Sequence, residues 1–344
     1  MKKLLLVGSN SVHTYNYLEL IASYFDEILI ITNEKREGTD FNAIELDFRL
    51  KLSSFFVTVR KIREICDDFH PSVIHVHQAN SFAFFSLLAA RKDNVPTILT
   101  AWGSDILLLP SKGVLMKKMV QFNLGHADYY TSDSKFMAEE MVRLNPAVKN
   151  VLIANFGIAL IPVDTPKENI IYSNRLHKKL YRVDKVIESF ARFIKLSSDK
   201  SWKLVIAGKG EDTPFLEKLA DDLQLGDKIE FVGWVDKQTN AQWYSCSKLW
   251  ISIPESDATA ISLLEAMAYG CIPVVSDLPA NREWITDGMN GLIVKDIEGD
   301  YISEALQINA ENAIVLNNER VNIDGTKEAN KKKFIALYDS ILNK

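Results

Sequence analysis

The stretch IPESDATAISLLEAMAYGCIPVVSDLPAN, residues 253–281, gives the clearest indication of the fold. Its middle predicts a helix that ends at Gly270, because glycine commonly terminates helices. The apolar run at residues 273–276 predicts a buried strand directly after that helix. A helix that leads straight into a short buried strand is typical of a parallel sheet with crossover helices, so this stretch predicts an α/β fold.

Short runs of Val, Ile and Leu alternate with longer amphipathic stretches along nearly the whole chain, as expected for parallel strands joined by helices. In the first half, the predicted strands lie at residues 3–7, 27–31, 72–77, 97–101, 129–131 and 151–153. In the second half, they lie at residues 170–173, 203–207, 228–231, 249–252, 273–276 and 291–294. Each series predicts one doubly wound, Rossmann-like unit.

The length of 344 residues also favours two domains, because a single hydrophobic core rarely extends beyond about 250–300 residues. The turn-forming stretch 155–167 holds Gly157, Pro162 and Pro166 and predicts the connection between the domains, with a boundary near residue 160. Apolar residues at helical spacing predict a last helix within residues 327–344.

The composition excludes several functional classes. Hydrophobic residues make up 47% and charged residues 25% of the chain, as in a soluble enzyme, and the net charge of -5 argues against nucleic-acid binding. The three cysteines are far apart and match no zinc or disulfide pattern, which fits a reducing cytosol. The chain has no apolar run of about 18 residues, and its N-terminal apolar run is too short for a signal peptide. We therefore expect a cytoplasmic protein.

The quoted stretch also predicts an anion site. If the helix begins directly after Asp257, the N–H groups of Ala258, Thr259 and Ala260 have no intrahelical acceptors and attract negative charge, so a diphosphate could bind there without a metal. Glu265 lies eight residues after Asp257, which is about 12 Å along a helix and about 80° around it. Glu265 would then hold a ribose and Asp257 the transferred sugar. Alternatively, Asp257 only caps the helix and Glu265 is a solvated surface residue.

This stretch resembles the signature of family 4 glycosyltransferases, which have the two-domain GT-B fold. Residues 264–270, LEAMAYG, and residues 273–275, PVV, match the signature, while Asp257 stands where the family commonly has a glutamate, which leaves the donor sugar open. The resemblance implies that residues 161–326 bind a nucleotide-diphosphate sugar. It also implies that residues 1–160 bind the acceptor and that the last helix, 327–344, returns to this first domain.

Basic residues after the first strand of the second domain are candidates for the donor phosphates. Residues 174–176, NRL, resemble the family's Gly-Arg-Leu element, whose arginine and a downstream lysine bind the donor diphosphate. Arg175 matches the arginine, and a guanidinium offers paired donors to phosphate oxygens. We assign the lysine to Lys179, with Lys178 and Arg182 as alternatives. The same run could instead be a solvated basic turn.

Three further positions complete the predicted donor site. Where the family passes its backbone along the nucleobase, this chain has Gly233 and Val235, so we expect main-chain contacts to the base there. Gly8 follows the first strand and would allow close approach of a diphosphate or an acceptor, unless it serves only a tight turn. The loop around Gly8 lacks a full Gly-x-Gly-x-x-Gly, which argues against a nicotinamide dinucleotide.

Polar and aromatic residues that follow two strands of the first domain are candidates for the acceptor. His77 ends one predicted strand, and Trp102 and Asp105 follow the next, so all three point to the same sheet edge. Trp102 stands where the family has a histidine; it would stack on an acceptor sugar, with Asp105 bonding its hydroxyls, or only fill the base of the domain. His75 and His77 share a strand face, but no third ligand follows at a recognisable spacing, so we expect no metal.

The resemblance implies a retaining glycosyltransferase of hexosyl type, with Asp257, Arg175 and Lys179 as its catalytic residues and no cofactor or metal. The chain has no Asp-x-Asp motif, which fits this expectation. A glycan or lipid-linked acceptor in bacterial surface polysaccharide, lipopolysaccharide or glycolipid synthesis is expected. The basic amphipathic stretch 112–124 would contact the inner membrane face peripherally, or pack in the core. The alternatives are a GT-B sugar-nucleotide epimerase and a non-catalytic sugar-nucleotide-binding protein.

Overall fold

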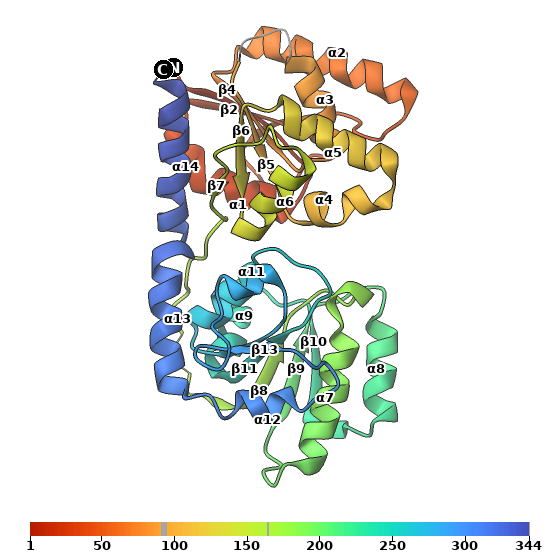
Figure 1. Cartoon of the computed structure of the whole chain (residues 1–344), viewed down its shortest axis with the longest axis vertical. Helices are drawn as coiled ribbons and strands as arrows, with labels where there is room; N and C mark the ends of the chain where they lie inside the picture. The colour runs from red at the N-terminus through yellow and green to blue at the C-terminus, as the bar shows by residue number, and fades with distance from the viewer. Residues whose placement is uncertain (91–94, 164, 344) are drawn as a thin grey trace. The chain divides into compact units, whose positions relative to one another are not determined.

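The computed structural model describes residues 1–90, 95–163 and 165–343 and divides into two compact units (Figure 1). Unit 1 comprises Met1–Phe156 and Lys327–Lys344, and unit 2 comprises Gly157–Thr326. Asp164 of the predicted connection and Lys344 of the predicted last helix lie outside the described residues. Each unit has its own parallel sheet and its own core, so each is described separately.

Unit 1 is built on a seven-stranded parallel sheet with the order β3-β2-β1-β4-β5-β6-β7. Its strands are β1 (Lys3–Val7), β2 (Glu27–Thr32), β3 (Asn42–Glu45), β4 (Val73–His77), β5 (Thr97–Thr100), β6 (Tyr129–Ser132) and β7 (Leu152–Ile153). The sequence did not predict β3, a short edge strand whose four residues are only partly buried or exposed. Such a strand lacks the continuous apolar run of a buried parallel strand.

The helices of unit 1 cover both faces of this sheet. They are α1 (Val12–Ile21), α2 (Leu52–Phe69), α3 (Ser81–Ala90), α4 (Ser104–Leu107), α5 (Val114–His126), α6 (Lys135–Leu144) and α14 (Lys327–Leu342). Helices α2, α3 and α5 lie together on one side of the sheet, and α14 packs beside α1 on the other (Figure 1). Phe334 and Tyr338 of α14 are fully buried in the same cluster as Leu4, Leu6 and Tyr17, so α14 is part of this core.

Unit 2 is built on a six-stranded parallel sheet with the order β10-β9-β8-β11-β12-β13. The strands are β8 (Glu168–Ser173), β9 (Lys203–Ala207), β10 (Ile229–Gly233), β11 (Ser247–Ser252), β12 (Ile272–Ser276) and β13 (Leu292–Val294). The helices are α7 (Val183–Leu196), α8 (Thr213–Asp222), α9 (Lys237–Cys246), α10 (Ile261–Ala268), α11 (Pro279–Arg282), α12 (Tyr301–Ala305) and α13 (Ala310–Asp324).

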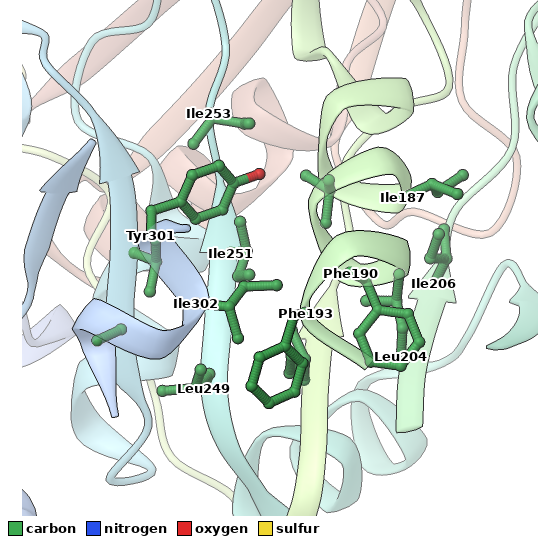
Figure 2. Close-up of a cluster of buried hydrophobic side chains, with 14 of the residues drawn as sticks. Ile187, Phe190, Phe193, Leu204, Ile206, Leu249, Ile251, Ile253, Tyr301 and Ile302 are labelled. Carbon is green, nitrogen blue, oxygen red and sulfur yellow. The ribbon is translucent and has the colours of Figure 1, made fainter. Parts of the chain in front are cut away.

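The central strands of unit 2 are apolar on both faces because helices cover both. On one face, Phe190 and Phe193 of α7 pack against Leu204 of β9 and Ile251 of β11 (Figure 2). On the other face, Trp250 of β11 packs in a second buried cluster with residues of α10. Burying one large apolar side chain contributes about 1.5–3 kcal/mol to stability, so the clusters on both faces stabilise the sheet.

The expected fold class, two doubly wound α/β units, is confirmed. The predicted strands are confirmed with ends within two residues of those observed. The predicted boundary near residue 160 compares with a division after Phe156. In the described part of the chain, none of the helices is both long and apolar enough to cross a bilayer. The loops at the carboxyl ends of the parallel strands carry the candidate residues of each unit.

Candidate functional site

The candidate residues of unit 2 converge at the carboxyl edge of its sheet. Arg175 lies in the loop after β8, Asp257 in the loop after β11, and Gly233 at the end of β10. Strands β8 and β11 pair directly, with Trp250 opposite Tyr172, so the loops that follow them leave the sheet side by side. Residues more than eighty positions apart in the sequence therefore meet at one edge.

Arg175 and Asp257 form a part-buried ion pair. The Nη2 of Arg175 lies 2.5 Å from Oδ2 of Asp257, and the two side chains are only 11% and 23% exposed. The Nη1 of Arg175 donates to the hydroxyl of Ser262 at 2.9 Å, and its guanidinium lies 4.5 Å from the centre of the Tyr181 ring. Charge-assisted hydrogen bonds are stronger and more directional than neutral ones, so these contacts fix the guanidinium in one orientation. The structure thus brings together two of the three predicted catalytic residues.

The predicted position of the helix start is wrong. Helix α10 begins at Ile261 with Ala260 as its N-cap, so Ala258, Thr259 and Ala260 lie in the preceding loop. Ala258 and Thr259 are buried, and the Thr259 hydroxyl accepts a hydrogen bond from the Trp284 indole at 3.3 Å. In standard helix geometry the unpaired first-turn N–H groups are those of Ile261 and Ser262. Asp257 is not the N-cap either.

The physical reason for this shift lies in the loop itself. The N–H of Glu255 donates to the carbonyl of Leu180 at 2.9 Å, and Ala260 has extended backbone angles, so the chain is tied to a neighbouring loop before it turns into the helix. Ala260 offers no capping side chain, so no residue at the true start marks it as a helix N-terminus. The expected spacing of Asp257 and Glu265 along one helix therefore does not apply.

Glu265 lies inside α10 and is partly buried. Its carboxylate accepts hydrogen bonds from the Asn240 amide, at 3.4 Å, and from the Tyr244 hydroxyl. Burial raises the pKa of Glu265, and these two hydrogen bonds partly oppose the rise. Glu265 is therefore a held carboxylate within the fold, and the alternative of a freely solvated helix residue is wrong.

A network of polar side chains supports Glu265, and the sequence did not point to it. Tyr172 donates to the Asn240 oxygen at 2.7 Å, Asn174 donates to the Tyr244 hydroxyl at 2.7 Å, and the Trp250 indole donates to the Asn174 oxygen at 2.9 Å. These residues come from strands β8 and β11, the loop after β8 and helix α9, so no single stretch of sequence carries the pattern. Their only common signal is polar atoms at positions that periodicity predicts to be buried.

The three candidates for the second cation are in different situations. Lys179 begins a short 3₁₀ turn and is exposed, as is Lys178. Arg182 has a left-handed backbone and pairs with Glu255 at 3.3 Å. Arg182 is therefore engaged in an ion pair, whereas both lysines present their charge to solvent.

The loop Gly208–Lys209–Gly210 has a structural reason for its glycines and adds a further cation. A Cβ on Gly208 would lie 2.6 Å from the carbonyl oxygen of Arg175, and one on Gly210 would overlap the His177 backbone. The arginine loop thus packs backbone to backbone against this loop. Lys209 extends over Gly233, because a Cβ on Gly233 would lie 2.9 Å from its Cε. Lys209 is not among the residues that the sequence analysis selected.

The segment predicted to contact the nucleobase begins at Gly233, the last residue of β10. Gly233 has a positive φ of 67°, and its carbonyl accepts the N–H of Gly208 at 2.7 Å. Val235 is partly buried against the second core cluster, and Trp234 between them is exposed. The role of this segment at a nucleobase stays a prediction.

The candidate residues of unit 1 also gather at a carboxyl sheet edge. A Cβ on Gly8, which follows β1, would lie 3.3 Å from the Cβ of His77 at the end of β4. The His77 ring packs edge-on against Tyr17 at 4.6 Å and Trp102 at 5.3 Å between centroids. Trp102 also packs against Phe156 at 5.9 Å, so it belongs to an aromatic cluster. Of its two predicted roles, this packing fits the filling of the domain base.

His77 is fully buried, and neither ring nitrogen has a hydrogen-bond partner among the described residues. Burial, with a smaller contribution from His13, lowers the pKa of His77 to about 3, so the ring is neutral. Burial also holds the pKa of His75 well below its usual range. His75 bonds Tyr338 at 2.6 Å and Thr100 at 2.6 Å, and no metal-binding group of three or more His, Cys, Asp or Glu occurs among the described residues.

Asp105 is not a surface carboxylate, which corrects its expected contact with an acceptor hydroxyl. It is 4% exposed, and its oxygens accept the N–H groups of Ala79 at 2.6 Å and Trp102 at 3.0 Å. Burial raises the pKa of Asp105, and these backbone hydrogen bonds oppose the rise. Asp105 ties the loop after β4 to the loop after β5. It therefore positions Trp102 from within the fold.

Two family models match the chain. The family described as Glycosyl transferases group 1 matches residues 160–322, and the family described as Glycosyl transferase 4-like matches residues 2–134. The first match includes Arg175, Asp257 and Glu265, and the second includes His77 and Trp102. Together they span most of both units.

Individual relatives are distant in sequence. The N-acetyl-alpha-D-glucosaminyl L-malate synthase of Bacillus anthracis is 24% identical over 306 residues, covering 82% of this chain and 77% of that protein. The alpha-monoglucosyldiacylglycerol synthase of Streptococcus pneumoniae is 24% identical over 258 residues, covering 68% of this chain and 58% of that protein. The crystal structure of Anabaena Alr3699/HepE in complex with UDP and glucose has a TM-score of 0.81 at 11% identity, covering 99% of this chain and 100% of that chain. This last likeness shows the fold.

Proposed function

We propose that this chain, which belongs to the group 1 glycosyltransferases of the GT-B fold, moves a sugar from a nucleotide-diphosphate sugar to a glycan or lipid-linked acceptor with retention of anomeric configuration. The observation that carries the donor part is the fixed guanidinium of Arg175, held by Asp257 and Ser262 at the carboxyl edge of unit 2. Two of its five N–H donors are engaged there, which leaves the others free to bind phosphate oxygens.

The chemistry we propose depends on charge that develops on the leaving group. Cleavage of the sugar–phosphate bond builds negative charge on the diphosphate, and donors fixed in advance stabilise that charge in the transition state. Arg175 supplies such donors, Lys179 adds a point charge, and the first-turn N–H groups of Ile261 and Ser262 take the place we had given to residues 258–260. These cations would neutralise the leaving group without a metal ion or another cofactor.

Asp257 and Glu265 would serve the donor in different ways. Asp257 fixes Arg175 through the ion pair, and it is a candidate to contact the transferred sugar once the diphosphate competes for the guanidinium. Glu265, held by Asn240 and Tyr244, would accept the ribose hydroxyls. The main chain at Gly233 and Val235 would contact the nucleobase. In a front-face mechanism the leaving phosphate takes the acceptor proton, so the proposal requires no dedicated protein nucleophile.

The acceptor side of the proposal concerns unit 1 and the membrane. Val114 and Leu115 at the start of α5 are exposed, and Lys112 and Lys117 beside them are exposed too. An exposed apolar pair flanked by lysines suits contact with an anionic lipid surface. We therefore propose peripheral contact of residues 112–124 with the inner membrane face, in a cytoplasmic enzyme of bacterial surface polysaccharide or glycolipid synthesis.

Thermal-shift measurements with uridine, guanosine and thymidine diphosphates and their sugars would test the donor proposal. One base should raise the melting temperature, because a ligand at about 100 times its Kd adds about 2.7 kcal/mol to stability. NMR of the product formed with that donor should then show a retained anomeric configuration. If none of these ligands raises the melting temperature, the proposed donor site is refuted. A product with inverted anomeric configuration would refute the proposed mechanism.

A further inference from the structure

Unit 1 has two concave surfaces, and the apolar one includes part of the stretch 112–124. A polar pocket of about 820 Å³ is lined by the ends of β1, β2 and β3, the loop that follows β3 and the first turns of α2 and α3. An apolar groove of about 430 Å³ is lined by the start of α2, by α3 and by α5. Helices α2, α3 and α5 lie side by side (Figure 1).

The polar pocket has the chemistry of a site for hydroxyl groups. Ser53, Ser54 and Ser81 place hydroxyls in its wall, and Glu45 and Lys61 add exposed charges. Within the wall, Arg49 also pairs with Asp47 through two hydrogen bonds, at 2.8 Å and 2.7 Å. Acidic and basic side chains balance in number here, so the pocket favours a neutral, hydroxyl-rich group over an anion.

The apolar groove exposes large hydrophobic side chains that a soluble protein would usually bury. Leu52 is 78% exposed and Leu115 is 73% exposed, and Phe55 and Phe122 line the wall between them. Exposed apolar residues are ordinary when scattered, but a contiguous group with a concave shape marks a binding surface. Lys51 and Lys118 stand at the rim, as expected where a hydrocarbon surface meets polar groups.

The pocket and the groove are both lined by residues of α2 and α3. Phe48 packs against Phe82 at 4.2 Å on the pocket side, and Phe55 packs against Phe84 at 5.9 Å on the groove side. Leu50 and Leu52 are exposed and line the groove, and their chain neighbours Arg49 and Ser53 line the pocket. The pocket also includes Ser9, which follows Gly8 at the sheet edge, so it continues the edge that carries the predicted acceptor residues.

We propose that the acceptor is an amphiphile whose hydroxylated head group binds the polar pocket and whose hydrocarbon chain crosses Leu50 and Leu52 into the apolar groove. This inference rests on the proposed function and selects the lipid-linked acceptor over a free glycan. The polar pocket is continuous with the acceptor edge, the groove is apolar, and one molecule that joins a sugar-like head to a chain matches both surfaces. A free polar glycan would leave the groove unused.

Binding of methyl and octyl β-D-glucoside to the full chain, measured by calorimetry below the concentration at which micelles form, tests the proposal. The two probes share a head group and differ in chain length. Octyl glucoside should bind at least tenfold more tightly, because each buried methylene adds to affinity. Leu52→Gln and Leu115→Gln should remove most of that preference. Leu196→Gln in unit 2, where the leucine is 77% exposed, is the matched control and should leave the preference unchanged.

A variant in the polar pocket separates the contribution of the head group to binding from that of the hydrocarbon chain. Glu45→Ala should weaken both glucosides by a similar factor and leave their ratio intact. Equal binding of the two probes by the wild type would overturn the proposal. So would groove variants that lose binding to phosphatidylglycerol vesicles while they keep the chain-length preference. The thermal shift given by the donor serves as the separate readout of the proposed function, because Leu52 and Leu115 are not part of unit 2.

Discussion

The carboxyl sheet edges of the two units hold their candidate side chains in opposite ways. In unit 2, Arg175 is bonded to Asp257 and Ser262, and Glu265 is held by Asn240, so charged groups are fixed by polar partners. In unit 1, His77 lies among aromatic rings, and its nitrogens have no hydrogen-bond partner among the described residues. Fixed polar groups suit a ligand whose charge changes during the reaction. A packed aromatic edge instead stabilises the base of the domain. Two similar sheets therefore carry their ligand-binding groups in different places, and in unit 1 the polar pocket is a better candidate for the acceptor site than the aromatic edge.

Arg175→Ala should have the largest effect on the donor site of unit 2. Loss of one fixed donor to a developing oxyanion typically costs about 10²–10³ in rate, so we expect kcat/KM for the nucleotide sugar to fall by at least about a hundredfold. Steady-state kinetics, with circular dichroism to check folding, would measure it. Arg175→Lys, which keeps the charge but loses paired donation, should recover only part of the loss. Arg60→Ala at an exposed site of unit 1 is the control. Unchanged kinetics in a folded Arg175→Ala protein would remove the proposed role.

The second prediction concerns stability at low pH. His75 and His77 are buried and neutral, with folded-state pKa values below their unfolded values, so the unfolded chain binds more protons as pH falls. The contribution of the two neutral histidines to the free energy of unfolding is fully present above about pH 6.5. It is lost as the pH falls toward the folded-state pKa, which is about 3 for His77. At pH 5 this loss is about 2 kcal/mol for His77.

Urea unfolding at pH 7 and pH 5 would measure this loss. His77→Gln should reduce the difference between the two pH values by about 2 kcal/mol, and His70→Gln at an exposed position should not change it. Burial also lowers the pKa of His177 in unit 2, although that ring bonds Thr213. Two fully buried histidines in one core still make unit 1 the more acid-sensitive unit. Equal pH dependence of the wild type and His77→Gln would contradict this assignment.

The fold could be predicted almost completely from the sequence, for a physical reason. Buried parallel strands are covered on both faces, so they appear as continuous apolar runs such as Leu4–Leu5–Leu6 or Val274–Val275. The exception was β3, whose edge position leaves Asn42 and Glu45 exposed. Edge strands lack that signal.

The site could be predicted only in part. Arg175, Asp257 and Glu265 were singled out by local motifs, but the ion pair between Arg175 and Asp257 joins loops that are far apart along the chain. Lys209 and Asn240 carried no local signal, because Lys209 reaches Gly233 only when β9 and β10 pair, and Asn240 reaches Glu265 only when α9 packs beside α10. The start of α10 was misplaced because Asp257 looks like a capping residue and Ala260 does not.

A substitution of Glu265 should have a smaller effect on the donor site than one of Arg175. Glu265→Gln keeps the shape and the contact with Asn240 but removes the charge, and a hydrogen bond to a charged group is worth about 1.5–3 kcal/mol. We expect the KM for the nucleotide sugar to rise by about tenfold, with a smaller change in kcat, because the ribose does not take part in bond cleavage. Asn240→Ala, which removes only a supporting contact, should have a smaller effect. A change in kcat alone would place Glu265 in the chemical step.

The smallest expected effect distinguishes the exposed cations of unit 2. Lys209 extends over Gly233 on the loop that packs against Arg175, whereas Lys179 is exposed on a separate turn. A solvent-exposed charge contributes little because water and salt screen it, so Lys209→Ala should raise the donor KM by only about threefold to fivefold, and less at high salt. Lys209→Arg should restore most of the affinity. If Lys179 alone binds the diphosphate, Lys179→Ala will show this salt-sensitive loss and Lys209→Ala will not. The cationic part of the donor edge would then end at the turn after Arg175.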